Sequence, residues 1–423
     1  MTPKTQRSLI IGIRRLVNVD DGWNEQMSHL PVIEGAALLI EAGKIARYGK
    51  EETLKKELAA EGILQSITEI IDIGGGDILP SYCDSHTHLL FPTSRETELF
   101  DRLRGLSYEE ISKRGGGILN SARKMESTSD EELLENALMR LDQLVRNGTG
   151  TVEIKSGYGL TPVQEIRMLR LIKELKKHTP LTICATFLGA HAFPEPFREK
   201  RDAYVEQIIS EMLPVVAKEN LAEFVDVFCE KGFFSVEQTE RILMASKSLG
   251  LIPRLHANQF THSGAIGCAV RQGAITVDHL EVMNDEEIEL LKHSRTMPTL
   301  LPGCAFFMSS PYPPARKMID AGLQVVLASD FNPGTNPSGD MKFMISLACL
   351  KMGMCVSEAI QASTRNGAKA LLLGDSRGSI GIGKRADLQI LKPLPSLEYI
   401  PYAYTEPLVK GVILGGNLLN INS

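Results

Sequence analysis

The middle of the chain alternates short apolar runs, rich in β-branched residues, with segments whose apolar residues recur at the helical period of 3.6. The runs predict eight strands, at residues 78–83, 151–154, 181–188, 224–228, 251–255, 274–277, 295–300 and 323–328. Among the intervening segments, a helix is predicted over 130–146, where Asn147-Gly148 ends it. Eight strand–helix units favour a closed (β/α)₈ barrel over an open sheet, and 423 residues leave room for a second, smaller domain.

Both ends of the chain differ from this middle, because they contain mostly short strand patterns. Alternating apolar residues and turn residues predict strands at residues 9–19, 36–40, 45–48, 67–73, 386–391 and 408–414. A predicted helix over 50–61 interrupts the N-terminal group. We therefore expect residues 1–76 and 376–423 to pair into one composite β-domain, and residues 77–375 to form the barrel.

Composition and charge exclude several classes of partner and compartment. The net charge of -6 gives no basic excess for binding nucleic acid or anionic lipid, and no apolar run approaches the roughly 20 residues of a membrane span. The apolar stretch 9–13 is too short for a secretory signal, so we expect a cytoplasmic protein. The seven cysteines are scattered and contain no C-x-x-C pair, which predicts buried, reduced thiols.

Polar residues follow most of the predicted strands, at the ends where a (β/α)₈ barrel carries its chemistry. His86 and His88 follow the first strand, and alternate side chains of an extended segment share a face, so the two imidazoles can bind one metal ion. The later strand ends carry Tyr158, His191, His256, His279 and Asp330. Any one of these histidines could be an ordinary buried residue, but together they predict a metal site.

This constellation, H-x-H and then His, His and Asp after strands one, five, six and eight, resembles the amidohydrolase superfamily. The resemblance implies an α/β fold, a distorted (β/α)₈ TIM barrel with a small composite β-sandwich domain formed by both chain ends. It also implies metal-assisted hydrolysis of amide-like bonds or deamination, with the metal ligands His86, His88, His256 and Asp330. Strand four ends in 226–230 with Lys231 only beyond it, so we expect no bridging lysine and one ion, Zn²⁺ or Fe³⁺, per chain.

Two members of the constellation are candidates for catalytic proton transfer. His279 is expected to polarise the scissile carbonyl or carry a proton, and Asp330 is expected to take a proton from the attacking water. A metal ion in such a site lowers the pKa of its bound water to about 7. Gln259 stands where some relatives have glutamate; since glutamine cannot act as a base, that role falls to other residues.

A finer resemblance, to the imidazolonepropionase family of histidine degradation, covers nearly the whole chain. The matching segments are 84–88, 107–111, 115–118, 153–160, 188–191, 226–230, 256–259 and 329–335. The segments Lys-Ser-Gly-Tyr-Gly at 155–159 and Ser-Asp-Phe-Asn-Pro-Gly at 329–334 are specific to that family. The resemblance therefore implies a small-molecule substrate, 4-imidazolone-5-propanoate, which is hydrolysed to N-formimidoyl-L-glutamate, and a homodimer.

The same resemblance implies roles for residues around the metal. Arg95 and Tyr158 would hold the propionate, with Tyr108 nearby, because a guanidinium pairs with a carboxylate through two parallel hydrogen bonds. His191 and Gln259 would contact the ring. The residues expected to contact the opened product are Asn332, Gly334 and Thr335.

Two alternatives stay open at the level of sequence. A related deaminase or cyclic amidase could act on another heterocycle, although the pair Arg95 and Tyr158 argues against it. A catalytically silent barrel could bind a ligand or partner, although the presence of all four metal ligands disfavours it. A panel of substrates distinguishes the first alternative, and the metal content of the protein distinguishes the second.

Overall fold

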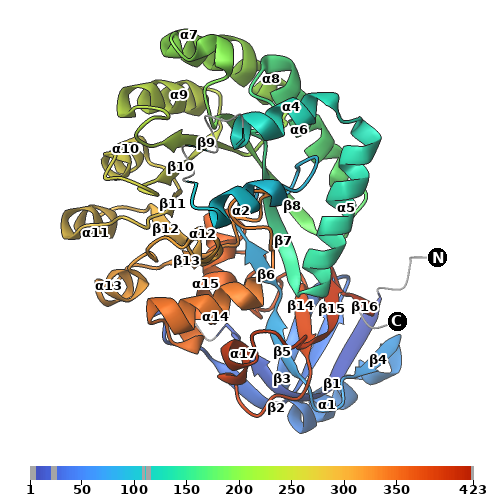
Figure 1. Ribbon diagram of the computed structural model, residues 1–423. Coiled ribbons are helices and arrows are strands. Elements are labelled where there is room, and N and C mark those ends of the chain that lie inside the picture. Colours follow the sequence, from blue (N-terminus) through green and yellow to red (C-terminus); the bar gives the residue numbers. More distant parts are fainter. Residues whose placement is uncertain (1–5, 21–25, 107–109, 111–115, 421–423) are drawn as a thin grey trace. The chain divides into compact units, whose positions relative to one another are not determined.

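A parallel sheet forms the framework that positions the site. The computed structural model describes residues 6–20, 26–106, 110 and 116–420. Within this described part, eight strands form one sheet in the order β13-β12-β11-β10-β9-β8-β7-β6, with parallel pairing from β8 to β13 (Figure 1). The strands are β6 (Tyr82–Asp84), β7 (Thr149–Lys155), β8 (Thr182–Ala190), β9 (Phe224–Cys229), β10 (Ile252–Ala257), β11 (Thr276–His279), β12 (Met297–Leu300) and β13 (Val326–Leu327). The predicted barrel is confirmed.

Backbone hydrogen bonds beyond the first and last of these strands close the barrel. The amide of Asp330 donates to the carbonyl of His86 (3.0 Å), and the amide of His88 donates to the carbonyl of Phe331 (2.9 Å). Thr87 and Phe331 form a parallel bridge between the same two segments. The seam of the barrel therefore brings together residues that lie more than 240 positions apart in the chain, and three predicted metal ligands lie on it.

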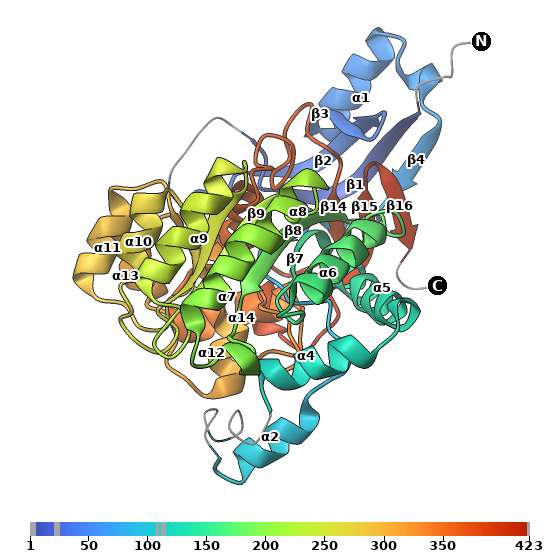
Figure 2. The same ribbon diagram turned by 90° about the horizontal axis from the view of Figure 1, so that it is seen from above.

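Helices flank the outside of the barrel strands (Figure 2). Helix α6 (Pro162–Leu175) begins at Thr161, whose side chain accepts from the amide of Gln164, and it buries an apolar stripe that includes Ile166, Leu169 and Ile172. The other α-helices that the structure describes between residues 85 and 339 are α2 (Glu96–Leu103), α4 (Ile118–Ser127), α5 (Asp130–Arg146), α7 (Arg201–Gln207), α8 (Leu213–Lys218), α9 (Val236–Ser248), α10 (Ala265–Gln272), α11 (Asp285–Lys292), α12 (Pro302–Met308) and α13 (Ala315–Asp320). The predicted helix over 130–146 is α5.

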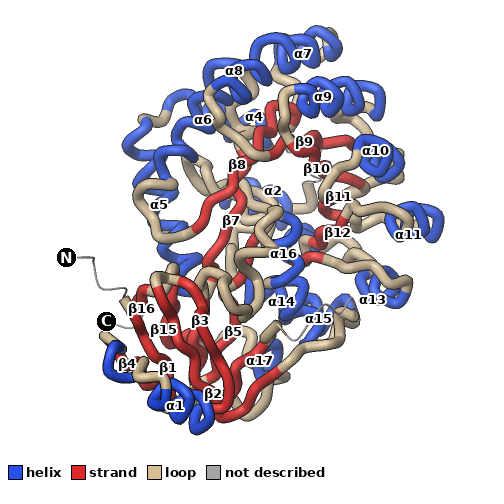
Figure 3. The backbone as a smooth tube through the Cα atoms, turned by 180° about the vertical axis from the view of Figure 1, so that it is seen from behind, coloured by secondary structure: helices blue, strands red, loops and turns tan. Residues whose placement is uncertain are grey.

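Strands from both chain ends form a second sheet (Figure 3). Its described strands are β1 (Arg7–Val17), β2 (Val32–Glu41), β3 (Lys44–Lys50), β4 (Glu69–Asp72), β5 (Asp77–Pro80), β14 (Leu388–Leu391), β15 (Val409–Leu414) and β16 (Asn417–Asn420). Strand β5 pairs with β1 on one side and β14 on the other, so N- and C-terminal residues share one apolar core that includes Ile13, Ile78 and Ile390. The predicted composite β-domain from both chain ends is confirmed, and its described strands form one mixed sheet.

In the described part of the chain, four further α-helices follow the barrel strands, and one lies in the N-terminal region. They are α14 (Met341–Met352), α15 (Val356–Ser363), α16 (Arg365–Ala370), α17 (Tyr399–Tyr402) and α1 (Glu51–Ala60). By its internal packing the chain divides into two compact units: the described residues of 1–84, 143–151 and 340–423, and those of 85–142 and 152–339. The domain boundaries predicted at 76/77 and 375/376 stay predictions.

One strand prediction was wrong, because the run 78–83 does not form a single strand. Residues Asp77–Pro80 belong to β5 of the terminal sheet, and only Tyr82–Asp84 form barrel strand β6. The change of sheet falls at Pro80-Ser81, where proline supplies no amide for a continuous ladder. His86 and His88 consequently lie two and four residues beyond the last residue of β6, and the barrel seam holds them in place.

Two further expectations concern thiols and membranes. All seven cysteines fall in the described part of the chain as free thiols; five are buried as predicted, whereas Cys349 is half-buried and Cys355 is exposed. Among the described residues, no helix is both long and apolar enough to cross a membrane.

Candidate functional site

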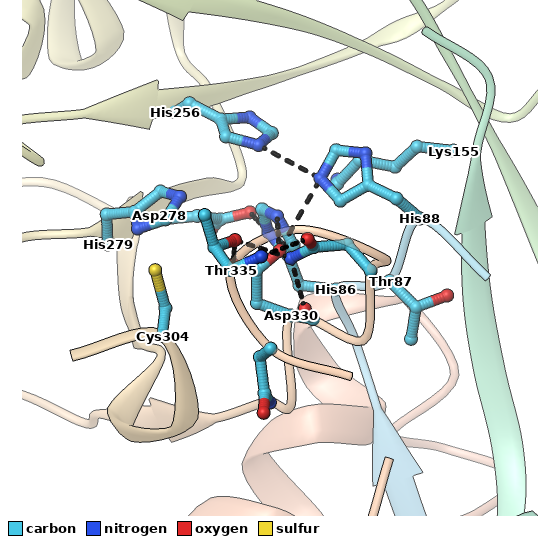
Figure 4. Close-up of polar contacts among 12 residues, drawn as sticks. His86, Thr87, His88, Lys155, His256, Asp278, His279, Cys304, Asp330 and Thr335 are labelled. Carbon is cyan, nitrogen blue, oxygen red and sulfur yellow. Dashed lines mark hydrogen bonds and ion pairs between the residues drawn. The ribbon is translucent and has the colours of Figure 1, made fainter. Parts of the chain in front are cut away.

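Four predicted metal ligands converge at the carboxyl end of the barrel, and we call His86, His88, His256 and Asp330 the histidine cluster (Figure 4). Asp330 Oδ1 lies 3.6 Å from His88 Nε2 and 3.8 Å from His86 Nε2. His256 Nε2 lies 3.4 Å from His88 Nε2. The ligand atoms of His86, His88 and Asp330 all lie within 4.8 Å of one another, and each of the four side chains is buried. This spacing suits nitrogen and oxygen atoms that surround one ion.

Buried carboxylates fix two imidazoles of the cluster. His86 Nδ1 donates to Asp278 Oδ2 (2.7 Å), and His256 Nδ1 lies 2.9 Å from Asp226 Oδ2. A carboxylate behind Nδ1 sets the tautomer that leaves Nε2 with its lone pair, as in metal-binding histidines generally. His86 Nε2 is buried and makes no hydrogen bond to any residue that the structure describes. An atom orphaned in this way is expected of a metal ligand, so the residues present fit the predicted ion.

Two imidazoles of the cluster, those of His86 and His88, are held in their neutral form. Burial lowers the pKa of His86 well below its ordinary range, and the nearby charge of Lys155 adds to this effect. Burial likewise lowers the pKa of His88, and the neighbouring His191 contributes. A neutral imidazole is the form that ligates a metal.

Beneath the cluster lies a network of fully buried charges that the sequence analysis did not assign. Lys155 Nζ contacts Asp226 Oδ2 (2.9 Å) and Glu153 Oε1 (2.8 Å). Burial opposes charge on Asp226, but His256 and Lys155 hold the pKa of that carboxyl well below its usual range. The signal in the sequence was charged residues at alternate positions of apolar strands, since Glu153 and Lys155 share one face of β7.

Asp278 is also part of a buried ion pair. Arg254 Nη2 lies 3.3 Å from Asp278 Oδ2 and donates to the carbonyl of Ser85 (2.7 Å), one residue before His86. Arg254 stands two positions before His256 in β10, so both side chains point to the same side of the strand. Arg254 therefore supports both the carboxylate behind His86 and the backbone that leads to it.

The two predicted proton-transfer residues adopt an unusual backbone. His279 has φ of +89° and Asp330 has φ of +56°, both in the left-handed region that non-glycine residues rarely occupy. His279 Nδ1 lies 3.3 Å from Glu281 Oε1. Burial opposes charge on His279, but the Glu281 carboxylate raises its pKa well above the ordinary value. Burial raises the pKa of Asp330, so both groups depart from their ordinary acidity.

The cluster opens into a pocket that holds about 460 Å³ of empty space including its mouth. Its lining residues are His88, Arg95, Ile118, Tyr158, His191, Phe228, His256, Gln259, Phe260, His279, Asp330, Asn332 and Thr335. Most of the predicted substrate-binding residues therefore share one pocket with three members of the cluster. Tyr108 lies outside the described residues.

Arg95 is positioned by what we call the arginine clamp, which consists of Arg95, Glu98 and Gly334. Arg95 Nε and Nη2 donate to Glu98 Oε2 (2.9 and 2.6 Å), and Glu98 Oε1 accepts from the amide of Gly117 (3.1 Å). A Cβ atom at position 334 would lie 2.4 Å from Arg95 Nη1, so only glycine allows the guanidinium to occupy this place. Gly334, which was predicted to contact product, thus packs against Arg95. Glu98 was not predicted.

His191 stacks on the histidine cluster. Its ring lies parallel to that of His88, with the centroids 5.0 Å apart, and Tyr158 lies 5.5 Å from it. His191 Nδ1 donates to the carbonyl of Gly157 (2.8 Å), which leaves Nε2 as an acceptor. Burial, together with His256, lowers the pKa of His191 to about 3, so this ring stays neutral at physiological pH.

Asn332 organises the loop that follows Asp330. Its Nδ2 donates to the carbonyl of Asp330 and to Thr335 Oγ1 (both 2.7 Å), and its Oδ1 accepts from the amides of Gly334 and Thr335. Thr335 Oγ1 lies 3.4 Å from Asp330 Oδ2. The side-chain amide of Asn332 therefore holds the shape of this loop.

Gln259, which was predicted to contact the substrate ring, also has a side-chain amide, and its Nε2 lies 3.5 Å from Cys304 Sγ.

Comparison with known proteins defines the class. The model of the amidohydrolase family matches residues 78–419, which is most of the chain. The fold agrees with that of the guanine deaminase of E. coli, with a TM-score of 0.76 at 16% identity over 98% of this chain and 99% of that one. An adenosine deaminase from Xanthomonas campestris with bound zinc gives a TM-score of 0.70 at 17% identity, over 97% and 92%. The chain belongs to the amidohydrolase family, and it is a hydrolase.

Relatives with similar sequences show to which group within the amidohydrolase family the chain belongs. The chain is 50% identical to the imidazolonepropionase of Flavobacterium johnsoniae over 93% of its own length and 94% of the relative's. It is also 50% identical to the imidazolonepropionase of Christiangramia forsetii, over 97% and 99%. These similarities place it, within the family, with the imidazolonepropionases. Membership in this family together with the buried His/Asp cluster supports a metal cofactor.

Proposed function

We propose that this chain hydrolyses the cyclic amide of 4-imidazolone-5-propanoate to N-formimidoyl-L-glutamate, a step of histidine degradation. The relatives that share half of its residues over nearly their whole length are imidazolonepropionases. The observation in the structure that carries the proposal is that Arg95 lines the same pocket as His88, His256 and Asp330. A pocket with a metal site and a buried guanidinium suits a hydrolysable ring that bears a carboxylate.

The histidine cluster would hold one ion, Zn²⁺ or Fe³⁺, through His86, His88, His256 and Asp330. When bound, the ion supplies Lewis-acid activation of water and of a carbonyl oxygen. Because His86 and His256 are oriented by Asp278 and Asp226, their Nε2 atoms are ready to bind the ion without rearrangement. Imidazole and carboxylate ligands suit either metal, and metal analysis of the purified protein distinguishes zinc from iron.

The remaining residues orient the substrate. Arg95, held at one edge by Glu98, would pair with the propionate, and the Tyr158 hydroxyl would share that carboxylate. Neutral His191 would accept a hydrogen bond from a ring N–H through its Nε2, and Gln259 would bind the ring through its amide. Asn332 and Thr335 would contact the opened product at the loop after Asp330, while Gly334 leaves room for Arg95.

Hydrolysis adds water to the ring carbonyl carbon and breaks its bond to the ring nitrogen. Asp330 would take the proton of the water, and His279 would polarise the carbonyl or deliver a proton to the departing nitrogen. Gln259 lacks a basic site, which leaves these two side chains as the titratable groups for the task. Both residues have backbone conformations that non-glycine residues rarely adopt, and such conformations persist only where the surrounding structure fixes them.

The assignment is tested by supplying the substrate, generated enzymatically from urocanate, to the purified protein while its metal content is assayed. We expect loss of the ring's ultraviolet absorbance, formation of formimidoylglutamate, and abolition of both by a chelator. A panel of aminated heterocycles and other cyclic amides serves as the control, and preferential turnover of one of them would contradict the proposal. The predicted homodimer and cytoplasmic location are separate predictions, which sedimentation and fractionation test.

A further inference from the structure

Cys304 brings a thiol next to two pocket residues, His279 and Asp330, at a position where the sequence predicts no ligand. It is the third residue of α12, just after β12, and its side chain is 1% exposed. Figure 4 shows its sulfur pointing toward His279. The ligand atoms of His279, Cys304 and Asp330 all lie within 4.8 Å of one another. A thiol, an imidazole and a carboxylate therefore converge in a buried place next to the histidine cluster.

The surroundings of these three side chains match those of a metal site. Glu281 Oε1 lies 3.3 Å from His279 Nδ1, which is the carboxylate support seen for His86 and His256. Gln259 Nε2 lies 3.5 Å from Cys304 Sγ. Asp330 belongs both to this group and to the histidine cluster, so its two oxygens could serve two neighbouring ions, as bridging carboxylates do.

We propose that His279, Cys304 and Asp330 form a second cation position, which takes a thiophilic dication such as Cd²⁺ or excess Zn²⁺ and thereby blocks hydrolysis. Thiolate ligands select soft and borderline ions, whereas the histidine cluster offers only nitrogen and oxygen. Binding forms a metal–sulfur bond to Cys304 and a metal–nitrogen bond to His279, and the thiol proton and the proton of the imidazolium both leave to solvent. The predicted inhibition rests on the proposed function, because the ion would occupy the catalytic candidates His279 and Asp330. The predicted binding of the ion does not depend on that function.

Cobalt titration of the metal-free protein tests the binding without any substrate. A thiolate bound to Co²⁺ gives a near-ultraviolet charge-transfer band, which nitrogen and oxygen ligands do not give. We expect the first equivalent of Co²⁺ to bind without this band and the second equivalent to produce it. The variants Cys304→Ser and Cys304→Ala are expected to bind the first equivalent, which shows that they are folded, and to lose the second equivalent and the band.

The control is Cys355→Ser, which removes the exposed cysteine and should leave both equivalents and the band unchanged. In the inhibition arm, Cd²⁺ added to the enzyme with its first site filled should inhibit wild type at a concentration at least roughly tenfold lower than either Cys304 variant. Absence of a band in wild type, a band with the first equivalent, or a band that persists in both Cys304 variants would overturn the proposal. Because the cobalt arm needs no turnover, a failure of the proposed function is distinguishable from a failure of this inference.

Discussion

The histidine cluster and the arginine clamp line one pocket, but they are built differently. His86 finds its carboxylate partner Asp278 192 residues away in the chain, whereas Arg95 and Glu98 are three residues apart at the start of α2. The geometry of the cluster therefore depends on closure of the whole barrel. The geometry of the clamp depends on one short helix and on the packing of Gly334 against Arg95. From this difference we infer that the cluster carries out the chemical step and that the clamp selects the substrate. Changes at the two places should consequently separate into effects on kcat and effects on KM.

The largest effect is expected from Asp330→Asn. This change removes both a metal ligand and a proposed proton acceptor, so kcat should fall by about 10³-fold or more, with reduced metal content. Steady-state kinetics and metal analysis on the same preparations measure both. The matched change Asp285→Asn, at an exposed carboxylate of α11, should leave both unaltered. If Asp330→Asn retained more than about a tenth of wild-type kcat, the proposed role of the cluster in the chemical step would be wrong.

The next largest effect is expected from Asp226→Asn. This change removes the negative charge of the buried carboxylate that contacts His256 and Lys155, and Asp226 does not line the pocket. The apparent Kd for Zn²⁺ should rise roughly 10–100-fold, because the carboxylate that orients a ligand imidazole is lost. At saturating metal, KM should stay near the wild-type value. Competition with a chromophoric chelator measures the affinity, and Asp202→Asn on the surface is the control. Unchanged zinc affinity would mean that the buried charges serve folding alone.

A smaller effect is expected from Arg95→Lys, and it should fall on KM and not on metal binding. Lysine keeps the positive charge but loses the planar fork that pairs with a carboxylate, so KM should rise about tenfold while metal content stays unchanged. Initial rates over a range of substrate concentrations measure this. A fall in kcat with constant KM would place Arg95 in the chemical step and would end the proposed separation.

The smallest effect is expected from Gly334→Ala. The added Cβ lies within 2.5 Å of two guanidinium atoms of Arg95, so the side chain must shift and KM should rise on the order of threefold. Gly49→Ala is the matched control, because that site has open space and an ordinary backbone. A loss of metal in Gly334→Ala would show that the loop after Asp330 couples the clamp to the cluster.

Local patterns predicted much of this molecule, and contacts between distant segments account for what they missed. Strand periodicity was enough to predict the barrel, and the polar residues that follow its strands predicted a site at that end. The choice of His86, His88, His256 and Asp330 as metal ligands came from the resemblance to the amidohydrolase superfamily. The split of 78–83 between two sheets was not predictable, since β5 is defined by its pairing with Leu388–Leu391. Likewise, an aspartate in a strand does not reveal which histidine it faces, so the partners Asp226 and Asp278 emerged only with the barrel register.

The most direct test of the central claim compares two substrates in two proteins. The substrates are 4-imidazolone-5-propanoate and its neutral propanamide analogue, and the proteins are wild type and Arg95→Ala, each with measured metal content. We predict that wild type prefers the carboxylate by about 10²-fold in kcat/KM, and that Arg95→Ala loses most of this preference with its metal intact. An equal preference in both proteins, or no turnover by the fully metallated wild type, would contradict the account.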